Sequence, residues 1–370
     1  MIPYFTTAFG NAASRSHIFG WTADRAVTHA REEIARLIGA DPREIVFTSG
    51  ATESNNLAIK GAFEYADRPD AEFITVATEH SSVIDVSRYL ESRGHKVTRL
   101  GVAPDGTINF GELVSAITDK TLMVSVMAAN NEIGVLQDVA GIGRMCRDRE
   151  ILFHSDATQA AGKIPLNPEA MNIDLMSLSA HKMYGPKGIG ALYVRRKPPR
   201  TRLSMQMHGG GHERGMRSGT LNVPGIVGFA KAAEICRADM AAETETITAL
   251  RERLIDGLLR IDGARLNGHR IKRVPGNANL SFAGIPGEAL LAGLDDIAVS
   301  SGSACNSASI EPSHVLSALG ISNAEAFASL RIGLGRFNTV EEVDYCISRV
   351  TETVNALKQG KGKMVVVAAS

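Results

Sequence analysis

The chain has 370 residues, of which 22% are charged and 44% hydrophobic, a composition that is typical of globular proteins and excludes a disordered chain. Its length exceeds the usual single domain of ~100–150 residues and predicts either two domains or one large α/β domain with an appendage. Forty basic residues balance forty acidic ones, so the bulk charge indicates neither a nucleic-acid nor a membrane-surface partner.

Export and membrane insertion are also not expected. No apolar run approaches the ~18–20 residues of a membrane span, and the N-terminus carries no cationic segment ahead of an apolar stretch. The cysteines are widely spaced, without a CxxC pair, which predicts a reducing cytoplasmic setting rather than a disulfide scaffold. They are Cys146, Cys236, Cys305 and Cys346.

Short apolar strands alternate with amphipathic helices from about residue 43 to 195. Strands are predicted at 43–50, 73–78 and 190–196, with helices at 51–66 and 82–94. This alternation predicts an α/β fold with a mostly parallel central sheet flanked by helices. Ligands of such sheets bind at the carboxyl ends of the strands, so the residues that follow each strand are the candidates for chemistry.

A glycine-rich polar loop at 208–219 marks a change in pattern. A long helix is predicted over 223–260, followed by helices and short strands such as 278–284. We therefore predict a large domain over 1–240 and a small C-terminal α+β domain over 241–370 that carries a cysteine-containing loop.

The segment GATES, residues 50–54, lies between a strand and a helix. Helix N-terminal amides bind phosphate, glycine allows a close backbone approach, and Thr52 adds a hydroxyl. No Gly-Lys-Ser/Thr follows, so this is not a Walker A loop. The alternative is an ordinary helix cap formed by Thr52 or Ser54.

Two charged residues follow apolar strands further along the chain. Asp156, in HSDATQ, needs a cationic or donor partner if it is buried, although it could simply cap a turn. Lys182, in SLSAHKMYGP, is expected to be desolvated, which lowers a lysine pKa and favours attack on a carbonyl. A lysine for an aldehyde, an aspartate for a ring nitrogen and a helix N-terminus for a phosphate are together the requirements of pyridoxal phosphate.

Cys305 differs from the other cysteines because it lies in SSGSACNSAS, a loop of small polar residues. Cysteine is usually buried as a small hydrophobe, so a cysteine in such a loop is either incidental or a reactive thiol, and the pattern favours the reactive thiol. The other three lie in helical patterns and are expected to be inert core residues. The histidine pair His208 and His212 lies in a glycine loop without a third ligand, which argues against a metal site.

The motifs GATESNN, TEHSSV, NNEIG, HSDATQ, SLSAHKMYGPKGIGALYVRR, GGGHERGMRSGT and SSGSAC together resemble those of cysteine desulfurases that feed iron–sulfur cluster assembly. These are pyridoxal-phosphate enzymes of the class V aminotransferase family. The resemblance spans about residues 8–350. It implies fold type I, a homodimer, and conversion of L-cysteine to L-alanine with the sulfur carried as a persulfide on Cys305.

The resemblance also implies a role for each matching residue. Lys182 matches the lysine that forms the Schiff base, and His80 matches the histidine that stacks on the ring and moves protons. Asp156 matches the partner of the ring nitrogen, and Gln159 matches the donor to the ring hydroxyl. The remaining cofactor contacts within one subunit, most of them near the phosphate, match Ala51, Thr52, Ser179, Ala180 and His181. Thr220 matches a phosphate contact that the partner subunit provides.

On the substrate side, Asn131 matches an asparagine beside the cofactor and substrate, and Arg331 matches the arginine that binds the substrate carboxylate. The implied partners are L-cysteine, a second copy of the chain, an iron–sulfur scaffold protein and other sulfur acceptors, with no nucleic acid and no membrane. No intrinsic metal is implied beyond a transient contact of Cys305 with a cluster.

Two features differ from the family pattern. Family members usually begin with an additional segment, so the N-terminal segment is expected to be truncated at a cost in activity, and the ending KQGKGKMVVVAAS replaces the usual C-terminus. Two alternatives remain. A related pyridoxal-phosphate lyase or transaminase, such as a selenocysteine lyase, would use the same lysine without a loop thiol. A catalytically inactive assembly partner would keep the fold without turnover.

Overall fold

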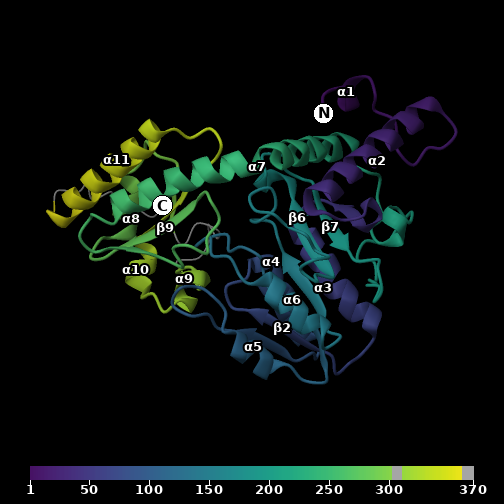
Figure 1. The fold of residues 1–370 in the computed structure, drawn as a ribbon, viewed down its shortest axis with the longest axis horizontal. Coiled ribbons are helices and arrows are strands. Elements are labelled where there is room, and N and C mark those ends of the chain that lie inside the picture. The colour runs from purple at the N-terminus through teal and green to yellow at the C-terminus, as the bar shows by residue number, and fades with distance from the viewer. Residues whose placement is uncertain (302–310, 361–370) are drawn as a thin grey trace, which may run out of the picture. The chain divides into compact units, whose positions relative to one another are not determined.

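The computed structural model describes residues 1–301 and 311–360. Within these residues the strands form two sheets, one of seven strands and one of four, and the chain divides into two compact units. The first unit holds the larger sheet and the second holds the smaller one (Figure 1). The predicted α/β class is confirmed.

The larger sheet has the strand order β1-β7-β6-β5-β4-β2-β3. Its strands are β1 Ile45–Thr48, β2 Glu72–Val76, β3 Val97–Leu100, β4 Thr121–Ser125, β5 Leu152–Asp156, β6 Leu175–Ser179 and β7 Gly190–Val194. From β6 to β3 all neighbours are parallel, whereas β7 is antiparallel to both β6 and β1. The prediction of a mostly parallel sheet is therefore confirmed.

Helices cover this sheet because their apolar stripes match its buried faces. Those of the first unit are α1 Pro3–Thr6, α2 Ile18–Ile38, α3 Ala51–Ala66, α4 Ser81–Ser92, α5 Phe110–Ala116, α6 Val139–Arg147 and the start of α7 Val223–Leu258. Leu57 of α3 and Val83 of α4 pack into one buried cluster with Phe73 of β2. Short 3-10 turns are η1 Pro42–Glu44, η2 Ala180–Lys182 and η3 Glu213–Gly215.

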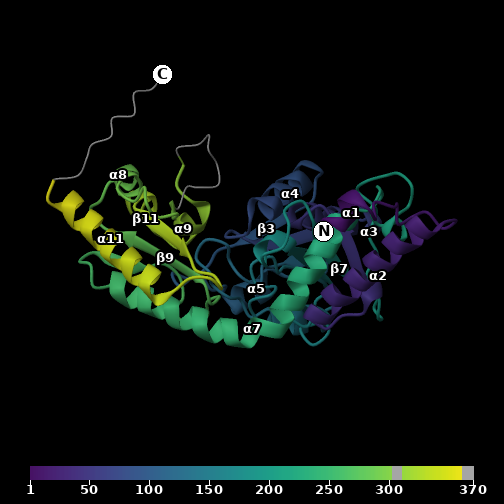
Figure 2. The ribbon, with the colours of Figure 1, turned by 90° about the horizontal axis from the view of Figure 1, so that it is seen from above.

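The second unit is built on an antiparallel sheet with the order β10-β11-β9-β8. Its elements are β8 Ala264–Leu266, β9 Asn277–Phe282, α8 Gly287–Ala292, β10 Ser300–Ser301, α9 His314–Ala318, α10 Asn323–Phe327, β11 Ser329–Gly333 and α11 Val340–Lys358. Leu254 of α7, Leu280 of β9 and Val350 of α11 are fully buried in its core. Figure 2 shows α11 and the end of α7 along one face of this sheet. None of the helices in the described ranges is long and apolar enough to cross a membrane.

The boundary between the units falls within α7, after Met240, but the first unit is not the continuous range 1–240 that the sequence predicts. Segments Gly101–Asn109 and Asn130–Leu136 belong to the second unit. The reason is packing: Ile133 and Val135 are buried in a cluster with apolar residues of the second unit, and Val135 forms a backbone bridge with Arg273. The predicted large domain over 1–240 therefore excludes residues 101–109 and 130–136, which belong to the second unit.

Candidate active site

The predicted site residues of the first unit follow the carboxyl ends of β5 and β6. Asp156 is the last residue of β5, and Ser179 is the last residue of β6, directly before η2 and Lys182. The two strands are parallel neighbours with Asp156 opposite Ser177. Their ends therefore lie at one edge of the sheet, as the sequence predicts.

Asp156 is buried, with 4% of its surface exposed. Its Oδ2 accepts from Asn55 Nδ2 at 2.8 Å and its Oδ1 accepts from the Thr158 amide at 2.9 Å. Among the described residues it has no ion-pair partner within bonding distance. Asp156 thus caps the local turn, which was the alternative role considered for it. Both of its hydrogen-bond donors are neutral, so the site also fits a cationic partner such as a protonated ring nitrogen.

A chain of hydrogen bonds links Asp156 to His80. Asn55 Nδ2 also donates to Ser82 Oγ at 2.8 Å, and that hydroxyl lies 2.9 Å from His80 Nδ1. The Ser82 amide donates to the same His80 nitrogen at 3.1 Å, which caps helix α4. Because Nδ1 accepts a backbone N–H, the neutral ring of His80 carries its proton on Nε2.

Asn55 and Ser82 were not identified from the sequence. Both are buried, one in the second turn of α3 and the other in the first turn of α4. The available signal was helical spacing: Asn55 lies four residues after Ala51, hence on the same face of α3 as that candidate phosphate contact.

The phosphate side of the site forms where α3 meets β6 and β7. The N-cap of α3 is Gly50, which has no side chain to donate or accept, so the expectation of a Thr52 or Ser54 cap is wrong. A Cβ on Gly190 would lie 2.6 Å from the Gly50 Cα, and one on Gly50 would lie 4.0 Å from Ser179 Oγ. The first amides of α3 therefore lie close to Ser179, at a helix end suited to a phosphate.

His181 completes this side. Its Nδ1 lies 2.9 Å from Ser179 Oγ. Burial lowers the pKa of His181, as do the positive charges of Lys182 and Lys187. Ala180 is buried, whereas Thr52, His181 and Lys182 are exposed, so the burial of the His181 ring is only partial. The sequence predicted a desolvated Lys182, and for the single chain this prediction is wrong, because the Lys182 side chain is exposed to solvent.

Two further buried groups surround Asp156. Burial and the negative charge of Asp156 raise the pKa of Glu79, whose Oε1 accepts from the Met127 amide at 2.6 Å. Burial lowers the pKa of His154 to about 4, and its ring nitrogens lie 2.8 Å from Ser125 Oγ and 3.1 Å from Ser177 Oγ. Burial thus favours the neutral form of both groups.

Thr220 is exposed in the loop between η3 and α7. The loop is tied to the first turn of α3 by Arg217, whose Nε donates to Glu53 Oε1 at 2.8 Å. Gln159, the candidate donor to the ring hydroxyl, is half-buried in the turn after β5. Each of these residues belongs to the first unit.

The second unit brings Asn131 and Arg331 together. Arg331, on β11, is half-buried and its Nη1 donates to the Asn131 carbonyl at 3.2 Å. The next carbonyl, that of Glu132, accepts from Asn277 at 3.1 Å and Asn279 at 3.2 Å, which holds this segment on the sheet. Within the described part of the chain, Asn131 Oδ1 is buried without a hydrogen-bond partner.

Cys305 lies outside the described residues. The strand that precedes it, β10, pairs with β11, with Ser300 opposite Arg331. The other three cysteines are buried in helices α6, α7 and α11, as expected. Burial raises the pKa of Cys146 to about 12 and that of Cys346 to about 11, which makes both poor nucleophiles.

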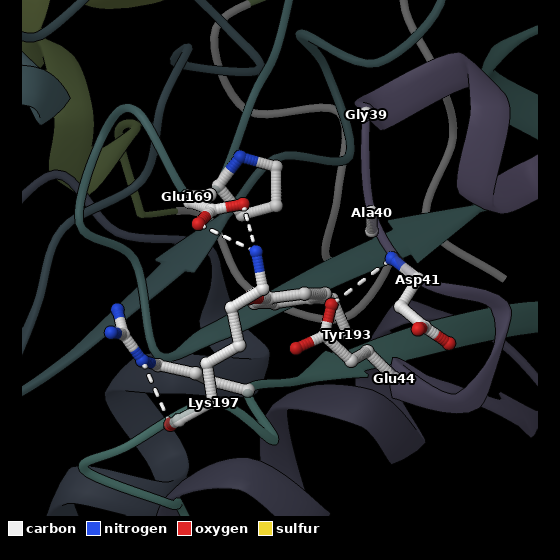
Figure 3. A pocket seen from close by; sticks show the side chains of 9 residues that line it. Gly39, Ala40, Asp41, Glu44, Glu169, Tyr193 and Lys197 are labelled. Atoms are coloured by element: carbon white, nitrogen blue, oxygen red, sulfur yellow. Dashed lines mark hydrogen bonds and ion pairs between the residues drawn. The ribbon is translucent and has the colours of Figure 1, made fainter.

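A separate pocket of about 170 Å³ lies beside η1 and contains none of the predicted site residues (Figure 3). Its charged side chains are bonded within the protein. Lys197 Nζ lies 2.6 Å from both Glu169 oxygens, and Arg195 Nη2 donates to the Pro198 carbonyl at 3.0 Å. No group of three or more metal-ligating side chains occurs in residues 1–301 and 311–360.

The chain matches the aminotransferase class-V family over residues 1–346 and belongs to that family. Its enzymes depend on pyridoxal 5′-phosphate, which is therefore the cofactor of this chain, and the buried Asp156 fits it. The chain is 57% identical to the cysteine desulfurase IscS of Anaeromyxobacter sp. (strain Fw109-5) over 360 residues, 97% of this chain and 89% of the relative.

Solved structures show the same likeness. A NifS-like protein is 37% identical with a TM-score of 0.89, covering 96% of this chain and 94% of its own. SspA in complex with cysteine is 36% identical with a TM-score of 0.81, covering 91% and 94%. The predicted family is confirmed.

Proposed function

We propose that this chain is a cysteine desulfurase that converts L-cysteine to L-alanine and passes the sulfur, as a persulfide on Cys305, to iron–sulfur cluster assembly and other acceptors. The observation that carries the proposal is the buried Asp156, connected through Asn55 and Ser82 to His80, at the sheet edge that leads to Lys182. The cysteine desulfurase named among its relatives supports this assignment.

Residues of the first unit would hold the cofactor. Lys182 Nζ would bind its aldehyde carbon covalently, Asp156 would accept the proton on its ring nitrogen, and Gln159 would donate to its ring hydroxyl. The amides at the start of α3, with Ser179 and His181, would bind its phosphate. When bound, pyridoxal phosphate supplies an electron sink for negative charge on the substrate α-carbon.

Proton movement is assigned to two side chains. Lys182 Nζ takes the α-proton of the substrate, and His80 moves protons at Nε2, because its Nδ1 is occupied by the Ser82 amide. The hydrogen bonds through Ser82 and Asn55 fix the His80 ring relative to Asp156.

The second unit is assigned the substrate carboxylate and the sulfur. Arg331 binds the carboxylate and Asn131 fixes its approach. The thiolate of Cys305 attacks the substrate sulfur: an S–S bond forms, the substrate C–S bond breaks, and the carbon keeps that electron pair and takes a proton. Cysteine plus the enzyme thiol therefore gives alanine plus the enzyme persulfide, and no external oxidant or reductant is needed.

The working form is proposed to be a homodimer in the cytoplasm, where reducing conditions preserve thiols. Two features support the dimer: the exposed Thr220, and large apolar residues exposed near the N-terminus, a composition typical of interaction surfaces. These apolar residues are Ile2, Phe5, Phe9, Ile18, Phe19 and Trp21. The sulfur acceptors would include an iron–sulfur scaffold protein.

The assignment of Lys182 is tested by Lys182→Ala. Purified protein loaded with pyridoxal phosphate is treated with borohydride and digested. The wild type should give a cofactor-labelled peptide that contains Lys182, whereas the variant should give none. Lys187→Ala, five residues on, is the matched control and should remain labelled. Labelling of a different lysine in both proteins would contradict the assignment.

The assignment of Cys305 is tested by Cys305→Ser with radioactive-sulfur cysteine and no reductant. The variant should bind the cofactor but form neither persulfide nor alanine at a useful rate, because a hydroxyl is a poor nucleophile toward sulfur. Cys236→Ser is the control and should accept sulfur on Cys305 normally. Normal turnover by Cys305→Ser would leave the plainer lyase function instead.

A further inference from the structure

A second lysine holds the side chain that is assigned to the ring hydroxyl. Lys163 Nζ donates to Gln159 Oε1 at 3.0 Å, and both side chains are half-buried. They lie four residues apart in the helical turn that follows β5, where the Ala161 amide donates to the Ala157 carbonyl and the Ile164 amide to that of Ala160. The hydrogen bond, and not helical spacing, therefore brings the two side chains together, because the left-handed Gly162 interrupts the turn between them.

Packing fixes the position of the turn. Gly162 has φ +74°, and a Cβ there would lie 2.9 Å from Cys236 Sγ and 3.1 Å from the Met183 Cβ. The turn therefore packs closely against α7 and against the residue that follows Lys182. Burial and the positive charge of Lys182 lower the pKa of Lys163 to about 8. Lys163 is thus still largely an ammonium at neutral pH.

This contact determines the orientation of the Gln159 amide. A side-chain amide presents an oxygen that accepts and a nitrogen that donates, and the two ends can be exchanged by rotation about one bond. An ammonium only donates, so the end that faces Lys163 has to be the oxygen. The two N–H donors on Nε2 then point away from Lys163.

We propose that Lys163 is a positioning residue that holds Gln159 with its N–H donors directed to the ring hydroxyl oxygen of the cofactor. The inference rests on the proposed function, since it requires bound pyridoxal phosphate. A donor at that oxygen stabilises its anionic form. It therefore affects the pH at which the visible absorbance of the bound cofactor changes.

The test is a pH titration of that visible band in the cofactor-loaded dimer. Lys163→Met should raise the midpoint by about one pH unit, the effect of losing one hydrogen bond to a charged group. Gln159→Ala should raise it similarly, and the double variant should not exceed Gln159→Ala alone. Lys163→Arg, whose guanidinium also only donates, should restore most of the wild-type midpoint.

Two results would overturn the proposal. One is an unchanged midpoint in Lys163→Met. The other is an equal shift of the titration midpoint when Lys163→Met is made in the wild type and in Gln159→Ala. The loss of the Lys163 charge alone would then explain the shift, without any role for Gln159. Thermal melting of each variant checks its folding, and Lys163→Gln replaces Lys163→Met if the latter is unfolded. A wild type that gives no visible band would instead overturn the proposed function, and this inference with it.

Discussion

His154 and Asp156 lie two residues apart on β5 and are both buried, yet the protein satisfies them differently. His154 is bonded on both ring nitrogens by serine hydroxyls, which suit a neutral ring. Asp156 receives an amide N–H and the Asn55 side chain, which suit a carboxylate. The donors to Asp156 are neutral, and so is the neighbouring ring of His154. The Asp156 carboxylate is therefore available to a cationic ligand.

The buried neutral His154 predicts a loss of stability in acid. Its pKa is about 4 in the folded chain against an ordinary value of 6.5, so the unfolded chain binds the extra proton. The resulting stability is complete above the unfolded value and is lost as the pH falls from about 6.5 towards 4, by up to about 3 kcal/mol. Urea unfolding at several pH values should show this slope, and His154→Gln should remove it.

The control for that experiment is His29→Gln, because His29 is exposed on α2. This variant should keep the wild-type slope. An identical slope in His154→Gln and the wild type would show that the ring is not held neutral by burial.

At the scale of elements, strand β1 is the edge of the larger sheet, and η3 closes that edge. Glu213 Oε2 accepts from the Phe47 amide at 2.7 Å, and both Glu213 oxygens accept from the Arg31 guanidinium at 2.7 Å. Glu213 and Arg214 adopt positive φ angles of 48° and 58°, which L-residues rarely do. These bonds therefore hold a strained turn that shields the edge strand and precedes Thr220.

Removal of the Glu213 carboxylate should be costly. Glu213→Ala leaves Arg31 largely buried without its ion-pair partner and the Phe47 amide without an acceptor, which should lower the free energy of unfolding by about 3–5 kcal/mol. Glu213→Gln should cost less, since its oxygen can still accept from that amide. Urea denaturation measures both.

The matched control is the exposed pair of Glu169 and Lys197, whose side chains are each 58% exposed. Glu169→Gln should leave the free energy of unfolding close to that of the wild type, because water screens an exposed ion pair. A similar small loss in Glu213→Ala would show that the edge strand does not depend on this ion pair.

At the scale of the whole molecule, the proposed reaction needs both units. Lys182, Asp156 and His80 belong to the first unit, whereas Asn131 and Arg331 belong to the second. The segment that carries Asn131 comes from between β4 and α6 of the first unit but packs with the second. A chain cut after α7 would therefore keep Asn131 but lack Arg331 and the sheet unit with which the Asn131 segment packs.

The proposed dimer predicts complementation between two inactive variants. If Thr220 acts on the partner's cofactor, a heterodimer of Lys182→Ala and Thr220→Ala chains contains one intact site, because the functional lysine and threonine then meet in one of the two sites. Activity of isolated heterodimers should exceed that of either homodimer. Activity of only about half that of the Thr220→Ala homodimer would mean that Thr220 acts within its own chain, because the one site that keeps Lys182 would then lack its threonine.

Sequence alone identified the strand-helix alternation and the residues after each strand. Hydrophobic periodicity is a local property, and parallel strands bring their carboxyl ends to one edge of a sheet. The chain alone therefore predicted that Asp156, Lys182 and the start of α3 lie together. The family motifs added roles for residues such as His80 and Arg331, which a strand pattern alone could not assign.

Only the tertiary structure decided the contacts between residues distant in sequence. The link from His80 through Ser82 and Asn55 to Asp156 joins three elements and leaves no periodic signal in the chain. The same holds for segment 130–136, which looks like a loop but packs with the second unit because Ile133 and Val135 are buried there. Burial and hydrogen bonding depend on which surfaces meet in three dimensions, and local sequence patterns do not record that.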